Sequence, residues 1–174
     1  MNTLDYEAEL AVILGKKGRC GPDDDPWSFV FGYTLVNDVT SRGLQKHHSQ
    51  WLLGKGIDGF CPMGPVLVTV DEIPDVNRLE IRCDVNGEER QRALLADLIF
   101  DIPTLIRTIG KSISFVPGDI IATGTPVGVG LGFDPPSICA RAMSSAFPSR
   151  RLASCASRSS DRQNVLTVSP YVGF

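Results

Sequence analysis

The sequence predicts an α+β fold, a β-rich roll built on a mixed or antiparallel sheet. Short apolar runs, rich in β-branched and aromatic residues, recur between clusters of Gly, Pro and Asp, which is typical of strands joined by turns. Helical patterns are few, and strands and helices hardly alternate, which argues against a parallel α/β sheet. With 174 residues, 43% of them hydrophobic, the chain is long enough for one domain with a substantial core.

The first strands are predicted from two apolar runs. "EAELAVILG" (7–15) ends in the turn "GKKGRCGPDDDP" (15–26), and "WSFVFGYTLVNDVTS" (27–41) follows as a second strand. "RGLQKHHSQWLLG" (42–54) has an uneven pattern that fits a short helix or a loop. "GPVLVTV" (64–70) is apolar and β-branched again, so we expect another strand there.

A hairpin and one helix are predicted further along the chain. "LEIRCDVNGEERQRA" (79–93) has the turn signal Asn-Gly between two strand-like runs. In "FDIPTLIRTIGKS" (100–112), Asp101 is suited to cap a helix and Pro103 to its first turn, and three apolar residues share one face: Leu105, Ile106 and Ile109. "VPGDIIATGTPVGVG" (116–130) is predicted to form a turn, a short buried strand and a Gly-rich loop.

The composition changes near residue 136. Residues 1–136 hold 12 basic and 19 acidic side chains, whereas residues 137–174 hold five arginines, one acid and nine serines. We therefore treat residues 1–136 as the domain and residues 137–174 as an atypical Ser/Arg-rich tail, which we expect to be disordered or to come from a shifted reading frame. Within the tail, a short strand at "NVLTV" (164–168) is the alternative to disorder.

Several function classes do not fit the composition. The five cysteines include no C-x-x-C pair, so neither a disulfide framework nor a zinc site is indicated. No apolar run reaches membrane-spanning length and no signal peptide is recognisable at the start, so we expect a cytoplasmic protein, with a mitochondrial one as the alternative. No basic patch interleaved with aromatic residues indicates nucleic acid, and we expect neither a nucleic-acid nor a membrane partner.

Glu7 and Glu9 stand at the start of the first predicted strand. Residues two apart on a strand face the same side, so the two carboxylates would point together, and burying either of them unpaired is costly. One interpretation is that a positive charge lies between them. The alternative is that the strand starts only at Leu10 and that both glutamates are solvated, because buried glutamates are rare.

Asp38 follows the second apolar run. An Asp at this point is often only a turn former. Brought together with Glu7 and Glu9, however, it would complete a three-carboxylate pocket suited to Mg²⁺ or Mn²⁺, with coordination positions left for water and substrate.

Two glycine-rich segments add candidate binding residues. Lys55 stands between two glycines in "GKGIDGFCPMGP" (54–65), where it is either a solvated lysine or a fixed cation near an anionic ligand. "TGTPVGVG" (123–130) lacks the G-K-[ST] ending of a nucleotide loop, but its backbone N–H groups and the Thr125 hydroxyl are suited to hold a carboxylate.

Six blocks of the sequence together resemble the fumarylacetoacetate hydrolase family, in particular its C-terminal catalytic domain. They run in the family's order and spacing from about Leu4 to about Pro136, which makes the signal specific. The blocks are "DYEAELAVILGKKGR", "GYTLVNDVTSRGLQ", "WLLGKGIDGFCPMGPVLVT", "VNGEERQ", "LIFDIPTLI" and "PGDIIATGTPVGVG".

The resemblance implies roles for individual residues. It places Mg²⁺ or Mn²⁺ on Glu7, Glu9 and Asp38. It also implies that Gln45, Lys55 and Thr125 take part in catalysis and bind the substrate, with Thr125 holding a substrate carboxylate.

The resemblance further implies a β-rich roll that pairs as a homodimer and an enzyme that acts on 2-oxo acids or 1,3-diketo acids. The chemistry is either hydrolysis of a C–C bond, of the acylpyruvate or fumarylacetoacetate type, or decarboxylation of oxaloacetate.

The chain also departs from the family. It begins almost at the E-x-E block, without the His and Glu segment that activates water, and its tail replaces the family's last strands, so we expect it to be truncated at both ends. The alternative function is therefore a non-catalytic member that binds metal or pairs with a full-length relative. Because decarboxylation needs less acid–base help than hydrolysis, we expect oxaloacetate decarboxylation to survive better, unless His47 or His48 acts as the base.

Overall fold

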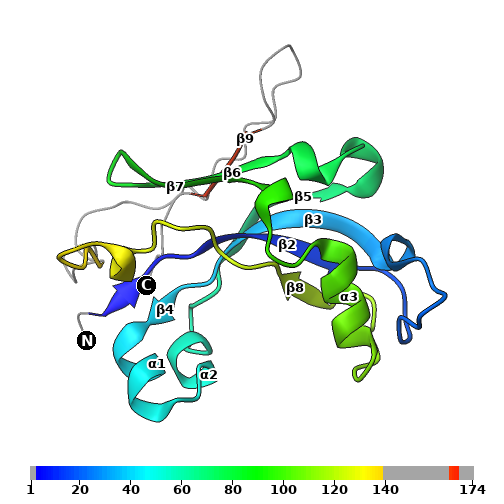
Figure 1. Cartoon of the computed structure of the whole chain (residues 1–174), viewed down its shortest axis with the longest axis horizontal. Coiled ribbons are helices and arrows are strands. Elements are labelled where there is room, and N and C mark those ends of the chain that lie inside the picture. The colour runs from blue at the N-terminus through cyan, green and yellow to red at the C-terminus, as the bar shows by residue number, and fades with distance from the viewer. Residues whose placement is uncertain (1–2, 139–164, 169–174) are drawn as a thin grey trace.

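The computed structural model describes residues 3–138 and 165–168 of the chain. Figure 1 shows strands β2 and β3 at the centre, the β6–β7 hairpin stacked over them, and α1 and α2 gathered at the opposite end beside β4. The strands are β1 (Leu4–Asp5), β2 (Ala8–Leu14), β3 (Val30–Asn37), β4 (Thr40–Ser41), β5 (Met63–Thr69), β6 (Glu80–Val85), β7 (Glu88–Leu94), β8 (Ile120–Ala122) and β9 (Val165–Val168). The helices are α1 (Arg42–His48), α2 (Leu52–Lys55) and α3 (Ile102–Gly110), with short 3₁₀ turns at Pro26–Phe29, Val70–Glu72, Val76–Arg78, Leu95–Asp97 and Gly130–Gly132.

The strands form three sheets. One has the order β5–β3–β2–β8 and is antiparallel throughout, the second has the order β7–β6–β9, and β1 pairs with β4. The β6–β7 pair is antiparallel and the β6–β9 pair is parallel, so the second sheet is mixed. The predicted α+β fold with mixed or antiparallel sheets is confirmed.

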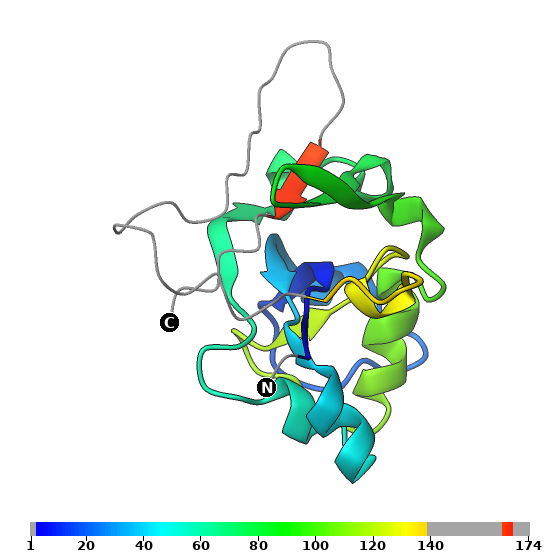
Figure 2. The same ribbon diagram turned by 90° about the vertical axis from the view of Figure 1, so that its left-hand side faces the viewer.

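The core lies between the two larger sheets and α3. Along β2, alternate residues Ala8, Leu10, Val12 and Leu14 are part of the core cluster. Their partners on the facing elements are Leu79, Ile81, Cys83, Val85, Leu95, Ile102 and Ile106. Figure 2 shows the same arrangement from the side, with the β6–β7 hairpin over the central strands. Because side chains alternate along a strand, Glu7 and Glu9 point away from this core.

The predicted hairpin and helix are both present. The β6–β7 turn places Asn86 and Gly87 at positive φ, of 55° and 84°, which is the backbone conformation that Asn-Gly turns favour. In α3, the Asp101 carboxylate accepts a hydrogen bond from the Thr104 N–H at 2.8 Å, and Ile106 is buried in the core. The cap and the apolar face of this helix therefore follow the sequence.

The start of β3 differs from the prediction. Pro26–Phe29 forms a 3₁₀ turn, and the Asp25 carboxylate accepts a hydrogen bond from the Trp27 N–H at 3.1 Å. The strand therefore begins only at Val30. Proline fixes φ near the helical value and Asp caps the turn, and these local effects outweigh the strand propensity of the aromatic run.

Part of the tail is described. At "NVLTV", where a short strand was the alternative to disorder, the structure has strand β9, which pairs with β6 over Glu80–Cys83. The predictions for the rest of the tail fall outside the described residues, and the domain boundary near residue 136 stays a prediction. In the part of the chain that the structure describes, none of the helices combines the length and the apolar character needed to cross a membrane.

Candidate metal centre

The structure brings Glu7, Glu9 and Asp38 together. In the β2–β3 ladder Ala8 pairs with Asn37, and the Asp38 N–H donates to the Glu7 carbonyl at 2.8 Å, so Asp38 lies opposite Glu7. One carboxylate oxygen from each of the three acids lies within 4.8 Å of the others. Glu7 and Glu9 are 7% and 4% exposed. β2 starts at Ala8, one residue after Glu7, and both glutamates are buried rather than solvated.

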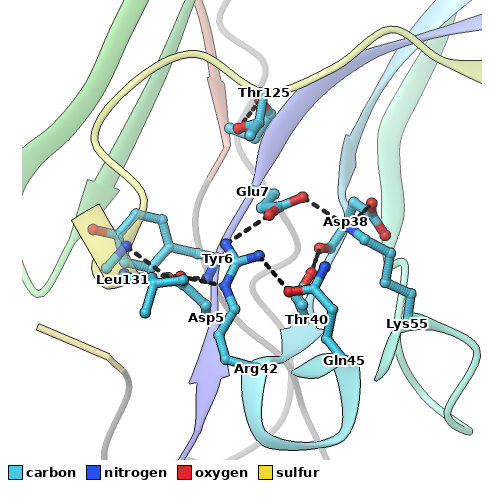
Figure 3. A network of polar contacts seen from close by, with 12 residues as sticks. Asp5, Tyr6, Glu7, Asp38, Thr40, Arg42, Gln45, Lys55, Thr125 and Leu131 are labelled. Carbon is cyan, nitrogen blue, oxygen red and sulfur yellow. Dashed lines mark hydrogen bonds and ion pairs between the residues drawn. The ribbon is translucent and has the colours of Figure 1, made fainter. Parts of the chain in front are cut away.

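Two basic side chains contact this cluster among the described residues. The Lys55 ammonium lies 2.8 Å from Glu7 Oε2 and also contacts Asp38 Oδ2. On the other side of Glu7, the guanidinium of Arg42 lies 2.6 Å from Oε1. Figure 3 shows Glu7 held between Arg42 and Lys55. Because opposite charges lower the cost of burying the acids, these contacts explain how the carboxylates are tolerated together.

Lys55 stays positively charged in this setting. Burial by itself would lower the pKa of its ammonium, but hydrogen bonds to Asp38 and Glu7 and their negative charges raise the pKa above the ordinary value. The side chain is therefore a hydrogen-bond donor and a fixed positive charge near neutral pH, and it is not suited to act as a general base.

Glu9 is the least compensated of the three acids. Burial raises the pKa of its carboxyl to about 7, the hydrogen bond from the Gly124 N–H opposes this rise, and the charges of Asp38 and Glu7 add to it. That N–H lies 2.8 Å from Glu9 Oε2. A divalent cation among the three carboxylates would remove the part of this rise in pKa that comes from repulsion.

Asp5 supports the cluster from behind. It is 1% exposed, and its Oδ2 accepts from Arg42 Nε at 2.9 Å and from the Leu131 N–H at 3.0 Å. Its Oδ1 accepts from the N–H groups of Gly130 and Tyr6, at 2.7 and 3.0 Å. Asp5 therefore fixes Arg42, and through it the orientation of Glu7 (Figure 3).

The loop after β8 is hydrogen-bonded to β2 and to the residues just before it, the segment that holds both glutamates. Thr123 donates through both its N–H and its hydroxyl to the Leu10 carbonyl. Further along the loop, the Tyr6 hydroxyl donates to the Gly128 carbonyl at 2.8 Å. With the bonds of Gly124 and Gly130 described above, residues 123–131 follow the strand from Leu10 back to Asp5. The loop thus forms one wall of the carboxylate cluster.

The other predicted site residues occupy different positions around the cluster. Gln45 Oε1 accepts from Arg42 Nη1 at 3.2 Å, so its amide lies beside the cluster. The Thr125 hydroxyl donates to the Ala8 carbonyl at 3.0 Å and accepts from the Gln91 amide at 2.8 Å, so it faces the strand backbone. His47 is exposed on α1, and the side chain of His48 is outside the described part.

Asp5 and Arg42 are site residues that no pattern in the sequence singled out. Both stand in the blocks that resemble the family. Asp5, Glu7 and Glu9 form a D-x-E-x-E series, and the same-face spacing that paired the two glutamates extends to Asp5. Arg42 stands in the "SRGLQ" segment, but no local pattern tells a buried arginine from a solvated one.

The donor set fits Mg²⁺ or Mn²⁺. Three carboxylates supply the hard oxygen ligands that these cations prefer, and the cluster contains no competing thiolate or imidazole ligand among the described residues. Among the bonds described, the buried carboxyl of Glu9 has no cationic hydrogen-bond partner. Of the three acids, Glu9 would therefore be stabilised most by a bound cation. The geometry of the residues is thus consistent with a hard-cation site.

Comparison with known proteins gives a consistent result. The sequence model of the family described as "Fumarylacetoacetate (FAA) hydrolase C-terminal" matches residues 1–154. The oxaloacetate tautomerase YisK of Bacillus subtilis is 54% identical over 133 residues, which are 76% of this chain and 44% of that protein.

Solved structures agree with the observed fold. A fumarylacetoacetate hydrolase from Exiguobacterium antarcticum is 45% identical with a TM-score of 0.73, over 78% of this chain and 49% of that one. A maleylpyruvate hydrolase from Sphingobium sp. SYK-6, in complex with manganese(II) and pyruvate, is 41% identical with a TM-score of 0.67, over 74% and 46% of the two chains. The chain therefore spans about half the length of the relatives it matches.

Proposed function

Because the chain belongs to the fumarylacetoacetate hydrolase family, we propose that it acts on 2-oxo acids at a divalent-metal site formed by Glu7, Glu9 and Asp38. The substrate class we propose is a small 2-oxo dicarboxylic acid such as oxaloacetate. The reaction is the interconversion of its keto and enol forms, with decarboxylation or C–C cleavage of related acids as chemistry that the same site would support.

One observation carries this proposal. Three carboxylates, of which Glu7 and Glu9 are buried and Asp38 is half-buried, have oxygens within 4.8 Å of one another, and the side chains of Arg42 and Lys55 flank them. The pKa of Glu9 is raised mainly by burial and further by the charges of Asp38 and Glu7, and strongly shifted groups of this kind cluster at functional sites. Bound there, Mg²⁺ or Mn²⁺ would act as a Lewis acid toward the oxygen of the 2-oxo group.

Lys55 and Arg42 have different roles in this proposal. Lys55 carries its charge at the open side of the cluster, with 20% of its side chain exposed. It is therefore placed to donate to the substrate oxygen on which negative charge develops when a proton leaves the neighbouring carbon. Arg42 is committed to Asp5 and Glu7, so we assign it to orienting Glu7 and not to the substrate.

Gln45 and Thr125 complete the proposed substrate pocket. The Gln45 oxygen accepts from Arg42, which leaves its amide NH₂ as the group for a substrate oxygen. For Thr125 we propose a contact with the substrate carboxylate through the backbone N–H groups of its loop, because the hydroxyl hydrogen is already donated to Ala8. Glycine-rich loops commonly bind anions through such N–H groups.

The named relatives support the substrate class. One is an oxaloacetate tautomerase, and another holds manganese(II) and pyruvate. Oxaloacetate and pyruvate share the 2-oxo carboxylate group, which offers two oxygens to a hard cation. The identity of 54% to the tautomerase favours tautomerisation over hydrolysis as the first reaction to test.

The experiment is a tautomerase assay on the purified chain. The absorbance of enol-oxaloacetate should decay faster with the protein and Mn²⁺ than with Mn²⁺ alone, and EDTA should abolish the difference. Asp38→Asn should remove most of the activity, whereas the control Asp23→Asn, in an exposed turn, should leave it unchanged.

Two other outcomes would change the conclusion. Activity that persists in EDTA and in Asp38→Asn would contradict a metal-dependent reaction. Tight Mn²⁺ binding without turnover of oxaloacetate, pyruvate or acylpyruvates would instead favour the non-catalytic metal-binding member. Homodimer assembly, which the resemblance implies, stays a prediction that light scattering on the purified chain would check.

A further inference from the structure

Gln91 is a buried polar residue for which the proposed function has no role. It is the last residue of the "VNGEERQ" block, lies in β7 and is only 1% exposed. Burying an amide without hydrogen bonds is costly, so its bonds should explain why the sheet tolerates it there.

The side chain of Gln91 closes a ring of hydrogen bonds around Ala8. Its Oε1 accepts from the Ala8 N–H at 3.0 Å, and its Nε2 donates to Thr125 Oγ1 at 2.8 Å. The Thr125 hydroxyl in turn donates to the Ala8 carbonyl at 3.0 Å. Both backbone groups of Ala8 are thus bound by two side chains from distant segments. Ala8 is the residue between Glu7 and Glu9.

Only one orientation of the amide satisfies the ring. The Ala8 N–H is a donor and needs the amide oxygen, and the second hydrogen of Nε2 goes to the Pro126 carbonyl at 2.8 Å. A flipped amide would place an NH₂ group against the Ala8 N–H and an oxygen against the Pro126 carbonyl. Because the Thr125 oxygen accepts from Nε2, its own hydrogen is left for Ala8.

The ring binds backbone groups of β2 that lie beyond the end of its neighbour β8. β8 pairs with β2 only from Ala11 to Ile13, and just after β8 the Thr123 N–H donates to the Leu10 carbonyl. The backbone groups of Glu7 bond toward β3, to Asn37 and Asp38. Backbone groups alternate between the two edges of a strand, so those of Ala8 point to the other edge, where β8 no longer reaches. Gln91 and Thr125 bind them instead.

Strand β7 also fixes the course of the loop. Gly128 has φ +105°, and a Cβ placed on it would come within 1.9 Å of the Arg90 carbonyl oxygen. The loop therefore passes directly over the β7 backbone next to Gln91, as only glycine permits. The same loop delivers the Gly124 N–H to Glu9. Gln91 is thus bonded to both walls of the cluster, the strand and the loop.

We propose that Gln91 is a positioning residue for the metal centre, because its amide sets the spacing between the glutamate strand at Ala8 and the loop at Thr125 and Pro126. This inference rests on the proposed metal site. Gln91 does not touch the carboxylates, so it acts by fixing the backbone between the two glutamates. Residues that orient metal ligands influence affinity even though they do not bind the metal.

The test compares Mn²⁺ affinity with thermal stability in the full chain. Gln91→Met keeps the length of the side chain and removes all three bonds, and we expect it to weaken Mn²⁺ binding by about 10-fold in calorimetry. Val85→Ala is the matched control: it removes a buried apolar group from the same hairpin and none of the ring's bonds. It should lower the melting temperature but change Mn²⁺ affinity by less than about twofold.

A second pair of variants keeps the test decisive if Gln91→Met fails to fold. Thr125→Val breaks the ring from its other side and should weaken Mn²⁺ binding as much, whereas Thr125→Ser keeps the hydroxyl and should retain the wild-type affinity. Because the ring acts as one unit, Gln91→Met combined with Thr125→Val should bind Mn²⁺ no more weakly than either single variant.

The outcomes separate the inference from the proposed function. Wild-type affinity in Gln91→Met or in Thr125→Val would overturn the positioning role. Equal losses of affinity in Gln91→Met and Val85→Ala would also overturn it, because general destabilisation would then explain both. A wild-type chain that binds no Mn²⁺ would instead refute the metal site itself, and the role of Gln91 with it.

Discussion

Lys55 Nζ lies 2.8 Å from Glu7 Oε2. The same ammonium contacts Asp38, so one lysine bridges two of the three carboxylates that the proposed cation would use. Its positive charge therefore compensates the cluster when no divalent ion is bound. A divalent cation that binds Glu7 Oε2 and Asp38 Oδ2 must share these oxygens with Lys55 or displace it.

We predict that Lys55→Met tightens Mn²⁺ binding while it lowers activity. Without the ammonium, the three carboxylates repel one another more strongly in the metal-free protein, so binding a dication relieves more repulsion. The Mn²⁺ dissociation constant should fall by about 10-fold, which corresponds to about 1.4 kcal/mol. Calorimetric titration of both proteins measures this.

The control for this variant is Lys46→Met, on the exposed surface of α1. It removes the same charge from the protein but not from the cluster, and its Mn²⁺ affinity should match the wild type. Weaker binding in Lys55→Met would mean that Lys55 supports the metal and does not compete with it.

Glu9→Gln should separate metal binding from stability. Losing one of three charged ligands should weaken Mn²⁺ and Mg²⁺ binding by at least about 10-fold. In EDTA at neutral pH, however, the variant should unfold at a higher temperature than the wild type, because it removes a buried carboxylate that costs energy to ionise. Calorimetry and thermal unfolding test the two halves. Unchanged Mg²⁺ affinity would exclude Glu9 as a ligand.

The stability of the metal-free protein should depend on the titration of Glu9. Its pKa is raised from 4.5 to about 7 in the folded protein. The stability that Glu9 contributes through this raised pKa is therefore complete below about pH 4.5, where Glu9 is protonated in the folded and in the unfolded protein. It is lost as the pH rises through about 7. The loss is on the order of 3 kcal/mol.

Thermal unfolding in EDTA, at a series of pH values from about 4.5 to about 8, checks this prediction. In Glu9→Gln, the melting temperature should decline less as the pH rises, because the part of the decline that Glu9 causes is absent. Because cation binding favours the ionised carboxylate, Mn²⁺ should raise the melting temperature of the wild type more at the alkaline end of the series. A Mn²⁺ effect that is the same at every pH would contradict this linkage.

Asp5→Ala should destabilise the fold as well as the site. The change leaves the buried Arg42 guanidinium without one of its two carboxylates and the N–H groups of Gly130 and Leu131 without their acceptor. Removing one partner of a buried ion pair typically costs about 3–5 kcal/mol. For a chain of this size that loss lowers the melting temperature by about 10 °C. Asp23→Ala, in the exposed turn, is the control and should change it little.

The elements that the sequence predicted correctly rest on local signals. The Asp101 cap, the Asn86–Gly87 turn and the strand alternation that pairs Glu7 with Glu9 each depend on residues within a few positions of one another. Such features depend on local backbone geometry, which can be predicted from the residue types at neighbouring positions. Where two local signals competed, at Pro26–Phe29, the proline and the Asp25 cap outweighed the aromatic run.

The residues that complete the site come from long-range contacts. Arg42 binds Asp5 across 37 positions, Gln91 binds Ala8 across 83, and Asp5 binds Gly130 across 125. Asp5 shares the spacing of Glu7 and Glu9, but nothing in the spacing indicates that a loop from the far end of the domain would donate to it. A side chain of Gln or Arg is compatible with many positions on a surface, so its sequence context does not reveal its burial.

By itself, the sequence determined the α+β class and the spacing that turns Glu7 and Glu9 to the same side, and it indicated three acids suited to a hard cation. Only the tertiary structure decided what surrounds them: Lys55 and Arg42 on either side of Glu7, and the loop held against Ala8 by Gln91. The physical reason is that the alternation of side chains along a strand and the capping of a helix depend on residues close together in the chain. The partners of a buried charge, in contrast, are set by which distant backbones the core brings into contact.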